Sequence, residues 1–361
     1  MSGADWPSSL HLVGSKALGG AERWVQRFAA ALAECGASAA VGVRRGSAVA
    51  ELHMGGLPVH PLPFWSVWDP ISRQAITRLV RAMRPDLVQT YMGRATRLTR
   101  LSGARRPLHI ARLGGYYKLA PYRHADAWIG NTRGLCDWMI GQGLPAAQVH
   151  HIYNFVDRAE AYPAGDIEVL RQRLHLREDT WVMLTLGRLI AVKGHGCLLD
   201  ALARLPAHIG GRPWCLVLVG EGPLRAALEH QAMALGIAER LVWVGWQPEP
   251  GPYLQLADLV VFPSRDAETL GNVILEAWAW RRALLTTRFR GAREIARHGE
   301  DAWCVACDDA SALAEGMQQL LRDDGLRAEL VRQGTRRVEA EFSKEVILAH
   351  YLDCYRSVLR S

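Results

Sequence analysis

The stretch TWVMLTLGRLIAVKGHGCLLDALARLPAHIGGRPWCLVLVGEG, residues 180–222, decides the fold. It opens with an apolar run (180–189), continues with a segment of helical spacing (196–209), and closes with a second short apolar run that ends in glycines (214–222). Short, continuous apolar runs are typical of strands buried on both faces, and a helix between two of them indicates parallel pairing. The stretch therefore predicts one strand–helix–strand unit of a parallel sheet.

The same alternation continues on both sides of this unit. Towards the C-terminus we predict strands over 240–246, 259–264 and 283–287, and helices over 223–237, 250–258, 271–281 and 312–323. In the N-terminal half the pattern is less regular, with strands over 10–15, 37–45, 58–64, 87–92 and 127–132, and helices over 21–36 and 71–86. This order predicts an α/β fold of two Rossmann-like, doubly wound domains.

The length and one irregular segment predict the domain boundaries. A chain of 361 residues is typical of two domains of ordinary size. The segment HIYNFVDRAEAYPAGD (151–166) has little periodicity and contains Asn, Pro, Gly and Asp, so we place the linker there. We therefore predict a first domain over 1–158, a second over 159–342, and a final helix over 343–361 with Ser343 as its N-cap.

The composition indicates a globular protein of the cytosol. No run of about 18 apolar residues is present, and the N-terminus lacks the pattern of a signal peptide. The odd number of cysteines, seven, fits a reducing compartment. Only Cys304 and Cys307 form a C-x-x-C pair, and a zinc site would need more ligands. We interpret this pair as small apolar residues on a strand and at its exit, and we expect no metal site.

The basic residues gather in the N-terminal half. The net charge is +7, and VRRGS (43–47), RATRLTRLSGARRPLHIARL (94–113) and YRHAD (122–126) carry much of it. Such a region is typical of a solvated basic surface, of a nucleic-acid interface, or of a surface that meets anionic lipid. No helix-turn-helix, zinc-finger or RNA-recognition motif accompanies it, which disfavours nucleic acid.

Two cations follow the first strand of the opening stretch. Arg188 comes after Gly187, and Lys193 precedes a predicted helix. Ligands of open α/β sheets bind at the carboxyl ends of the strands, where Arg and Lys suit a diphosphate. Without further context they are equally well ordinary surface cations.

Gly220 and Gly222 follow the next strand. They form a lone G-x-G, and Arg225 stands where a dinucleotide-binding motif would have its third glycine, so an NAD site is disfavoured. These glycines indicate either a tight turn or a close approach of a ligand or a neighbouring loop to the backbone.

The segment DAETLGNVILEAWAW (266–280) combines two carboxylates with a helix start. Glu268 precedes the predicted helix, which begins at Gly271–Asn272, and Glu276 lies inside it, roughly 8 Å along the axis from Gly271. A helix N-terminus favours phosphate, and a nearby carboxylate suits the vicinal hydroxyls of a ribose. An ion pair with a nearby arginine is the alternative for either glutamate. A second pair of glycines, Gly19–Gly20, opens the first helix of the other domain and predicts another ligand turn.

Together, these motifs resemble a known family. GGAER (19–23), GRL followed by KG, LVGEGP, YLQLADLVVFPS and two glutamates eight residues apart occur in the order typical of retaining GT-B glycosyltransferases of family 4, the group that includes bacterial lipopolysaccharide-core and exopolysaccharide transferases. The resemblance implies two Rossmann-like domains that face a central cleft, and a final helix that packs on the first domain. It further implies an enzyme that moves a sugar from a UDP- or GDP-sugar to a glycolipid, lipopolysaccharide-core or oligosaccharide acceptor.

The resemblance also assigns roles to residues. Arg188 and Lys193 would hold the diphosphate, Glu268 the sugar hydroxyls and Glu276 the ribose. Gly187, Gly220, Gly222 and the pair Gly19–Gly20 would let the backbone approach the donor. Contacts from the start of the helix would come from Leu270, Gly271, Asn272 and Val273. Because the two cations replace a metal ion, we expect no metal and no cofactor, and the basic half predicts an anionic membrane surface as a further partner at the inner face of the cytoplasmic membrane.

Three segments depart from the family pattern, and other functions stay open. Gln89–Tyr91 stand where a histidine is common, Arg281–Leu284 replace G-x-P-V, and 290–294 replace a GG-x-x-E loop. These changes concern the sugar and acceptor sides. The alternatives are a sugar epimerase or phosphorylase of the same fold, or a non-catalytic sugar- or nucleic-acid-binding protein.

Overall fold

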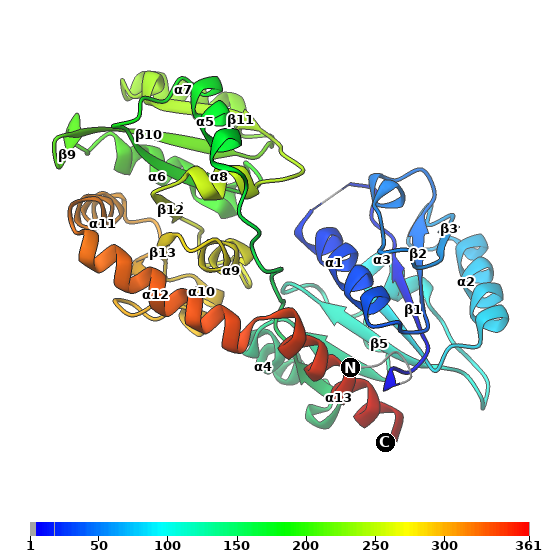
Figure 1. Cartoon of the computed structure of the whole chain (residues 1–361). Coiled ribbons are helices and arrows are strands. Elements are labelled where there is room, and N and C mark those ends of the chain that lie inside the picture. The colour runs from blue at the N-terminus through cyan, green and yellow to red at the C-terminus, as the bar shows by residue number, and fades with distance from the viewer. Residues whose placement is uncertain (1–4, 18, 361) are drawn as a thin grey trace. The chain divides into compact units, whose positions relative to one another are not determined.

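The computed structural model of the chain describes residues 5–17 and 19–360. These residues form two compact units, Met1–Asn154 with Lys344–Ser361, and Phe155–Ser343. Figure 1 shows that each unit has its own sheet with helices around it. The division between the units falls at Asn154, close to the predicted boundary at residue 158, and the final helix is part of the first unit.

The first unit contains a sheet of seven parallel strands in the order β3-β2-β1-β4-β5-β6-β7. The strands are β1 (Ser9–Val13), β2 (Ala39–Arg44), β3 (Val59–Leu62), β4 (Leu87–Tyr91), β5 (Leu108–Leu113), β6 (Ala127–Gly130) and β7 (Val149–His151). All five residues of β1 and of β4 are buried, as expected for central strands covered on both faces. The strand order reverses between β1 and β4, the type of position where open α/β sheets bind ligands.

Helices connect these strands. They are α1 (Gly20–Glu34), α2 (Pro70–Met83), α3 (Met92–Leu98), α4 (Arg133–Gly141) and the C-terminal α13 (Lys344–Arg360), with short 3-10 turns at η2 (Ala48–Glu51) and η3 (Ala146–Gln148). Helix α2 shows how the sequence sets its ends: the Asp69 carboxylate accepts from the Ile71 N–H at 3.0 Å, and Arg84 is left-handed before Pro85.

Helix α13 packs on the first unit through buried tyrosines. The ring of Tyr351 lies 4.4 Å from that of Phe28 on α1, and its hydroxyl accepts from Arg112 Nε at 2.8 Å. The Tyr355 hydroxyl donates to Gln89 Oε1 at 2.8 Å. Lys344, at the start of the helix, pairs with Glu34. Gln89 therefore serves to dock this helix, in a segment where the family often has a histidine.

The second unit contains a parallel sheet in the order β11-β10-β8-β12-β13-β14, and the short β9 is antiparallel to β10. The strands are β8 (Trp181–Leu186), β9 (His208–Ile209), β10 (Arg212–Val219), β11 (Leu241–Gly245), β12 (Leu259–Phe262), β13 (Ala283–Thr287) and β14 (Trp303–Val305). All residues of β8, β12 and β13 are buried. The parallel strand–helix–strand unit predicted from residues 180–222 is confirmed by the pairing of β8 with β10.

Eight α-helices accompany the strands of the second unit. They are α5 (Ala164–Arg173), α6 (His195–Leu202), α7 (Arg225–Ala234), α8 (Gly251–Leu256), α9 (Asn272–Ala279), α10 (Arg290–Ile295), α11 (Ala310–Arg322) and α12 (Asp324–Glu341), with 3-10 turns at η4 (Ala191–Lys193) and η5 (Ala238–Arg240). Among the described residues, no helix is long and apolar enough to cross a membrane.

One predicted helix is shorter than expected. The helix predicted over 196–209 ends at Leu202, and His208–Ile209 form β9 instead. Pro206 has no N–H to continue the helix, and the two glycines at 210 and 211, both with positive φ, turn the chain back into β10.

Candidate active site

The carboxyl ends of β8, β10 and β12 bring the predicted residues of the second unit to one edge of its sheet. Because these strands are neighbours and parallel, the loops after Leu186, Val219 and Phe262 leave the sheet side by side. Gly187, Gly220 and the segment that leads to Gly271 lie in these three loops. This is the edge at which open α/β sheets bind their ligands.

The glycine loops after β8 and β10 are interlocked. Gly187 donates its N–H to Val219 O at 3.0 Å, and Leu189 donates to Glu221 O at 3.0 Å. A Cβ on Gly220 would lie 1.9 Å from Gly187 O, and one on Gly222 would lie 2.4 Å from Leu189 O. Of the two interpretations of this G-x-G, the close approach of a neighbouring loop accounts for both glycines.

Lys193 and Glu268 meet at this edge. Their Nζ and Oε2 atoms are 2.7 Å apart, and the side chains are only 18% and 16% exposed. The ammonium also lies 5.0 Å from the centre of the Phe262 ring. The structure thus joins the cation predicted for the diphosphate to the carboxylate predicted for the sugar.

Gly194 fixes the position of Lys193. It has a φ of +68°, which favours glycine, and a Cβ there would lie 2.0 Å from Pro263 O. The backbone between Lys193 and helix α6 therefore packs directly on the end of β12. Arg188, after the same strand β8, is exposed, and no carboxylate pairs with it among the residues that the structure describes.

The N-terminus of α9 lies in the loop after β12. Gly271 is its N-cap with a φ of +76°, and a Cβ there would lie 2.6 Å from the Phe289 ring and 2.8 Å from the Phe262 ring. Leu270 and Val273 are buried and Asn272 is half-buried, so the first two contribute mainly backbone to this surface. A glycine N-cap supplies no side-chain oxygen, and the first N–H groups of the helix favour an anion.

Glu276 lies in α9 and is half-buried, one turn beyond Asn272. The tryptophans that follow it differ: Trp278 is fully buried and donates Nε1–H to Asp301 O at 2.8 Å, whereas Trp280 is half-buried and stacks on Tyr162. Trp278 therefore belongs to the core of the second unit, whereas Trp280 lies at its edge. The contact of Glu276 with a ribose stays a prediction.

Several residues of this edge were missed in the sequence. Arg293 and Arg290 pair with Asp266 at 2.8 and 3.2 Å, and although burial raises it, these hydrogen bonds bring the pKa of Asp266 below its ordinary value. Gly291 packs so closely that a Cβ would lie 2.0 Å from Thr269 O. The segment 290–294 therefore holds the loop that carries Glu268 in place, through ion pairs and close packing. The departure from the family's glycine pattern hid this role.

Gly19 and Gly20 belong to the first unit, after the carboxyl end of β1. Gly19 is the extended N-cap of α1, and a Cβ there would lie 3.0 Å from Glu22 Oε2. A Cβ on Gly20 would meet no described atom within 4 Å. Packing within the unit therefore does not require glycine at position 20.

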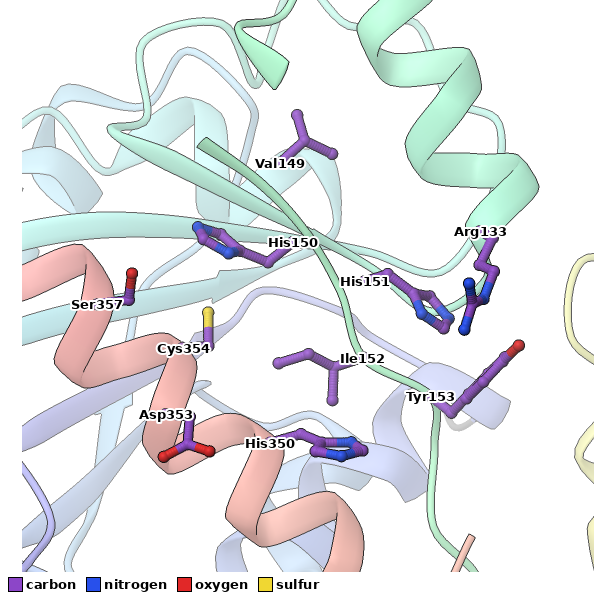
Figure 2. A pocket seen from close by; sticks show the side chains of 10 residues that line it. All are labelled: Arg133, Val149, His150, His151, Ile152, Tyr153, His350, Asp353, Cys354 and Ser357. Carbon is purple, nitrogen blue, oxygen red and sulfur yellow. The ribbon is translucent and has the colours of Figure 1, made fainter. Parts of the chain in front are cut away.

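A separate hollow lies in the first unit, between β7 and α13 (Figure 2). Its volume is about 580 Å³, and Figure 2 shows His150, His151, His350 and Asp353 among the side chains around it. Burial lowers the pKa of His150. Across residues 5–17 and 19–360, no three His, Cys, Asp or Glu side chains group as metal ligands, and none of the predicted site residues lines this hollow.

Burial raises the pKa of the Cys304 thiol to about 12, as expected of a small core residue.

Comparisons with known proteins identify the family. Residues 166–337 match the model of glycosyl transferases group 1, and residues 18–160 match that of glycosyltransferase family 4. The chain is 30% identical over 342 residues to the lipopolysaccharide core biosynthesis glycosyltransferase LpsE of Rhizobium meliloti, covering 94% of this chain and 96% of that protein. It is 28% identical to LpsD of the same organism, covering 93% and 95% of the two chains.

Solved structures agree with the predicted fold. The crystal structure of Anabaena HepE in complex with UDP and glucose superposes with a TM-score of 0.82 at 22% identity, covering 96% of this chain and 99% of HepE. This likeness and the two parallel-sheet units confirm the predicted GT-B architecture. The chain belongs to the group 1 glycosyl transferases and is a glycosyltransferase of GT-B fold.

Proposed function

We propose that the protein is a retaining, metal-independent glycosyltransferase that moves a sugar from a UDP- or GDP-sugar to a glycolipid acceptor of the lipopolysaccharide-core type. The observation that carries the proposal is the half-buried Lys193–Glu268 pair, with Nζ and Oε2 2.7 Å apart, at the sheet edge where α9 begins. A cation, a carboxylate and a helix N-terminus at one edge suit a ligand that combines phosphate with sugar hydroxyls.

The relatives support the donor and acceptor classes. HepE was solved with UDP and glucose and, separately, with UDP-glucose, which favours UDP over GDP here. LpsE and LpsD are named for lipopolysaccharide core biosynthesis, and the match to both spans nearly the whole chain. An acceptor of this kind is anchored in a membrane, so we place the reaction at the inner face of the cytoplasmic membrane.

In the proposed reaction, charge stabilisation replaces a metal ion. The bond between the anomeric carbon and the diphosphate breaks, and negative charge develops on the leaving oxygen. Lys193 and Arg188, with the N–H groups at the start of α9, stabilise this charge. The acceptor oxygen forms the new bond on the same face of the sugar, and its proton passes to the leaving phosphate. No protein base is required in this scheme.

Glu268 and Glu276 position the donor in this scheme. Glu268 accepts hydrogen bonds from sugar hydroxyls, and Glu276 accepts them from the ribose. When the diphosphate arrives, Lys193 exchanges part of its contact with Glu268 for phosphate oxygens. Because these contacts orient the reacting carbon, loss of Glu268 or of Glu276 lowers the rate of transfer.

Purified variants test these roles with a panel of UDP- and GDP-sugars. We expect Lys193→Ala and Glu268→Gln to lower kcat about a hundredfold or more while both variants stay folded at the assay temperature, with a lower melting temperature because the remaining charge loses its half-buried partner. Glu329→Gln, in an exposed ion pair with Arg332 on α12, is the matched control and should keep full activity. Full activity of Lys193→Ala or Glu268→Gln would refute the assigned roles.

The anomeric configuration of the product tests the stereochemistry. With an α-linked donor, we expect NMR of the product to show an α-linkage. A β-linked product would contradict the retaining mechanism but leave the transferase itself standing. Equal turnover with and without a chelator is the expected result for the metal-independent scheme.

A further inference from the structure

Part of the first unit exposes large apolar side chains beside arginines. The segment between β3 and α2 leaves Trp65 60% exposed and Trp68 68% exposed, and Ile71 at the start of α2 is 52% exposed. These are among the most exposed large apolar side chains of the described residues. Three such side chains within seven residues of sequence form a local patch rather than scattered surface positions.

The backbone of this segment is fixed. Phe64 is fully buried, its N–H donates to Ser72 Oγ at 2.7 Å, and its carbonyl accepts from Arg94 Nη1 at 3.1 Å. Asp69 in turn accepts from the Ile71 N–H at 3.0 Å. The two indoles are therefore held on the surface by a buried anchor and by the cap of α2.

Arginines on α2, on α3 and just after α3 accompany the patch. The Arg97 guanidinium lies 4.4 Å from the centre of the Trp68 ring. Burial and the positive charges of Arg73 and Arg97 lower the pKa of Arg100. Whereas Arg106 is paired with Asp126 at 2.6 Å, no acidic side chain pairs with Arg73, Arg97 or Arg100 among the described residues.

The segment that contains the patch carries an excess of positive charge. Residues 44–105 hold ten arginines and only three acidic residues, an excess equal to the +7 of the whole chain. Of the three acids, Asp69 is buried as the cap of α2 and Asp86 binds the Ser8 N–H at 2.8 Å. The cations therefore attract an anionic partner with little compensation from the protein.

We propose that Trp65, Trp68 and Ile71, together with Arg73, Arg97 and Arg100, form a docking surface for anionic lipid bilayers. We call these six residues the Trp–Arg face. Indoles partition to the interface of a bilayer, and arginines beside them bind lipid phosphates. A soluble polyanion would satisfy the arginines but leave the two indoles and Ile71 in water, so a bilayer matches the face better.

The Trp–Arg face adjoins the carboxyl edge of the first sheet. Helix α3 begins directly after β4, and a Cβ on Gly14, which follows β1, would lie 3.2 Å from Arg94 Cγ. A bilayer on this face would hold a lipid-anchored acceptor near the loop that leads to Gly19 and Gly20. This inference rests on the proposed function and deepens it, because it names the surface that would meet the membrane of the acceptor.

Vesicle sedimentation of the full chain tests the face. We expect binding to vesicles of phosphatidylglycerol and phosphatidylcholine at low salt, and weak binding to phosphatidylcholine alone. The affinity should fall about 25-fold in Arg97→Ala/Arg100→Ala, at about fivefold for each arginine, and at least about tenfold in Trp65→Ala/Trp68→Ala. Trp246→Ala and Arg332→Ala, at exposed positions of the second unit, should bind like the parent.

Three outcomes would overturn the proposal. The first is equal vesicle binding by the parent and by the face variants, and the second is equal binding of the parent to neutral and anionic vesicles. The third concerns polyuridylate, a soluble polyanion: the face variants would lose binding to it but keep their binding to vesicles. Transfer to a short soluble acceptor separates this proposal from the transferase itself. The face variants should keep that activity, whereas Glu268→Gln should lose it and still bind vesicles.

Discussion

At the scale of single residues, the Lys193–Glu268 pair explains how two charges tolerate a half-buried place. The carboxylate neutralises the ammonium, and the Phe262 ring, 5.0 Å from Nζ, adds a cation–π contact. Removing one member would leave the other charge with little solvent and no partner, which is more costly than losing an exposed ion pair. The pair is thus held ready for a ligand that carries both phosphate and hydroxyl groups.

Gly194 is the residue whose substitution should disturb this pair most without touching it. In Gly194→Ala the methyl group would clash with Pro263 O at 2.0 Å, and φ is +68°, so we expect a loss of about 2–5 kcal/mol in unfolding free energy and lower activity. Urea denaturation and a transfer assay check this. Gly210→Ala, with a φ of +57° but open space around it, should lose only about 1 kcal/mol and stay active.

Sequence reasoning identified residues at this edge but not their partners. It placed Lys193 and Glu268 after predicted strands, and the family resemblance gave them roles. They are 75 positions apart, however, and only the pairing of β8 with β12 brings them together. Phe262 and Phe289 pack edge to face beneath Gly271 and read in the sequence only as apolar residues. Side-chain contacts across a sheet depend on register, which a single sequence does not specify.

At the scale of elements, α13 depends on buried hydrogen bonds as well as on packing. Arg112 is 3% exposed, donates to Tyr351 Oη at 2.8 Å, bonds to Asn154, and lies 4.7 Å from the centre of the Trp24 ring. Tyr91 joins Gln89 and His11 in the same interior. Arg112, Gln89, Tyr91 and Tyr351 each have a hydrogen-bond partner in this layer, which is the condition for burying a polar group.

Removing one hydroxyl from this layer should therefore be costly. Tyr351→Phe leaves the Nε–H of Arg112 buried without its partner, so we expect unfolding free energy to fall by about 1–3 kcal/mol. Chemical denaturation provides the measurement. Tyr253→Phe is the control, because its hydroxyl accepts from Arg173, which is exposed and can bond to water instead. Equal losses in both variants would contradict the burial argument.

Buried histidines should make stability depend on pH. Burial lowers the pKa of His11 and His109 to about 3 and that of His195 to about 4, below the ordinary value of 6.5. These rings are neutral in the folded state, so as pH falls below 6.5 the unfolded chain binds protons that the folded chain does not. The contribution of these neutral rings to the free energy of unfolding is therefore fully present above pH 6.5. It is lost as the pH falls towards 4, at up to about 1.4 kcal/mol per pH unit for each ring.

Urea midpoints at successive pH values check this dependence. His11→Gln should reduce the slope of unfolding free energy against pH by the contribution of one proton, because one of the three rings is absent. His230→Gln, at an exposed position of α7, should leave the slope unchanged. A stability that is constant from pH 7 to pH 5 would contradict the assignment of these rings as neutral.

The elements that the sequence predicted well are those that carry their own signal. β8 and β12 are continuous apolar runs, and both are fully buried. β7 and β9 span only three and two residues, so neither has a detectable period. The predicted strand over 87–92 ends one residue early, because Met92, with a φ of 61°, turns the chain into α3. Short elements are set by their neighbours rather than by local propensity.

At the scale of the whole molecule, the two units differ in how the chain builds them. The second unit is one continuous segment, Phe155–Ser343, and all strands of its sheet and its main apolar core come from that segment. The first unit takes its sheet from residues before 155 but needs α13 to cover Trp24 and Phe28. A return of this kind depends on contacts over more than two hundred residues, and no local pattern reveals it; only the family resemblance predicted it.

Fragments should reproduce this difference. We expect residues 155–343 alone to unfold cooperatively and to be stabilised by UDP, because a ligand that binds only the folded state raises its melting temperature. Residues 5–154 alone should lack a cooperative transition, since their large aromatic side chains on α1 are uncovered. Joining residues 344–360 to them through a flexible linker should restore it. Circular dichroism during heating distinguishes these cases, and a stable 5–154 fragment would refute the role given to α13.

The discontinuity of the first unit sets an order of events on the ribosome. Its seven strands are synthesised first, but Tyr351 and Tyr355 emerge only after the whole of the second unit. The second unit, which needs nothing beyond Ser343, can complete its fold while the earlier part of the nascent chain still waits for its final helix. A nonsense codon between those of Ser343 and Tyr351 would therefore damage the unit that is translated first.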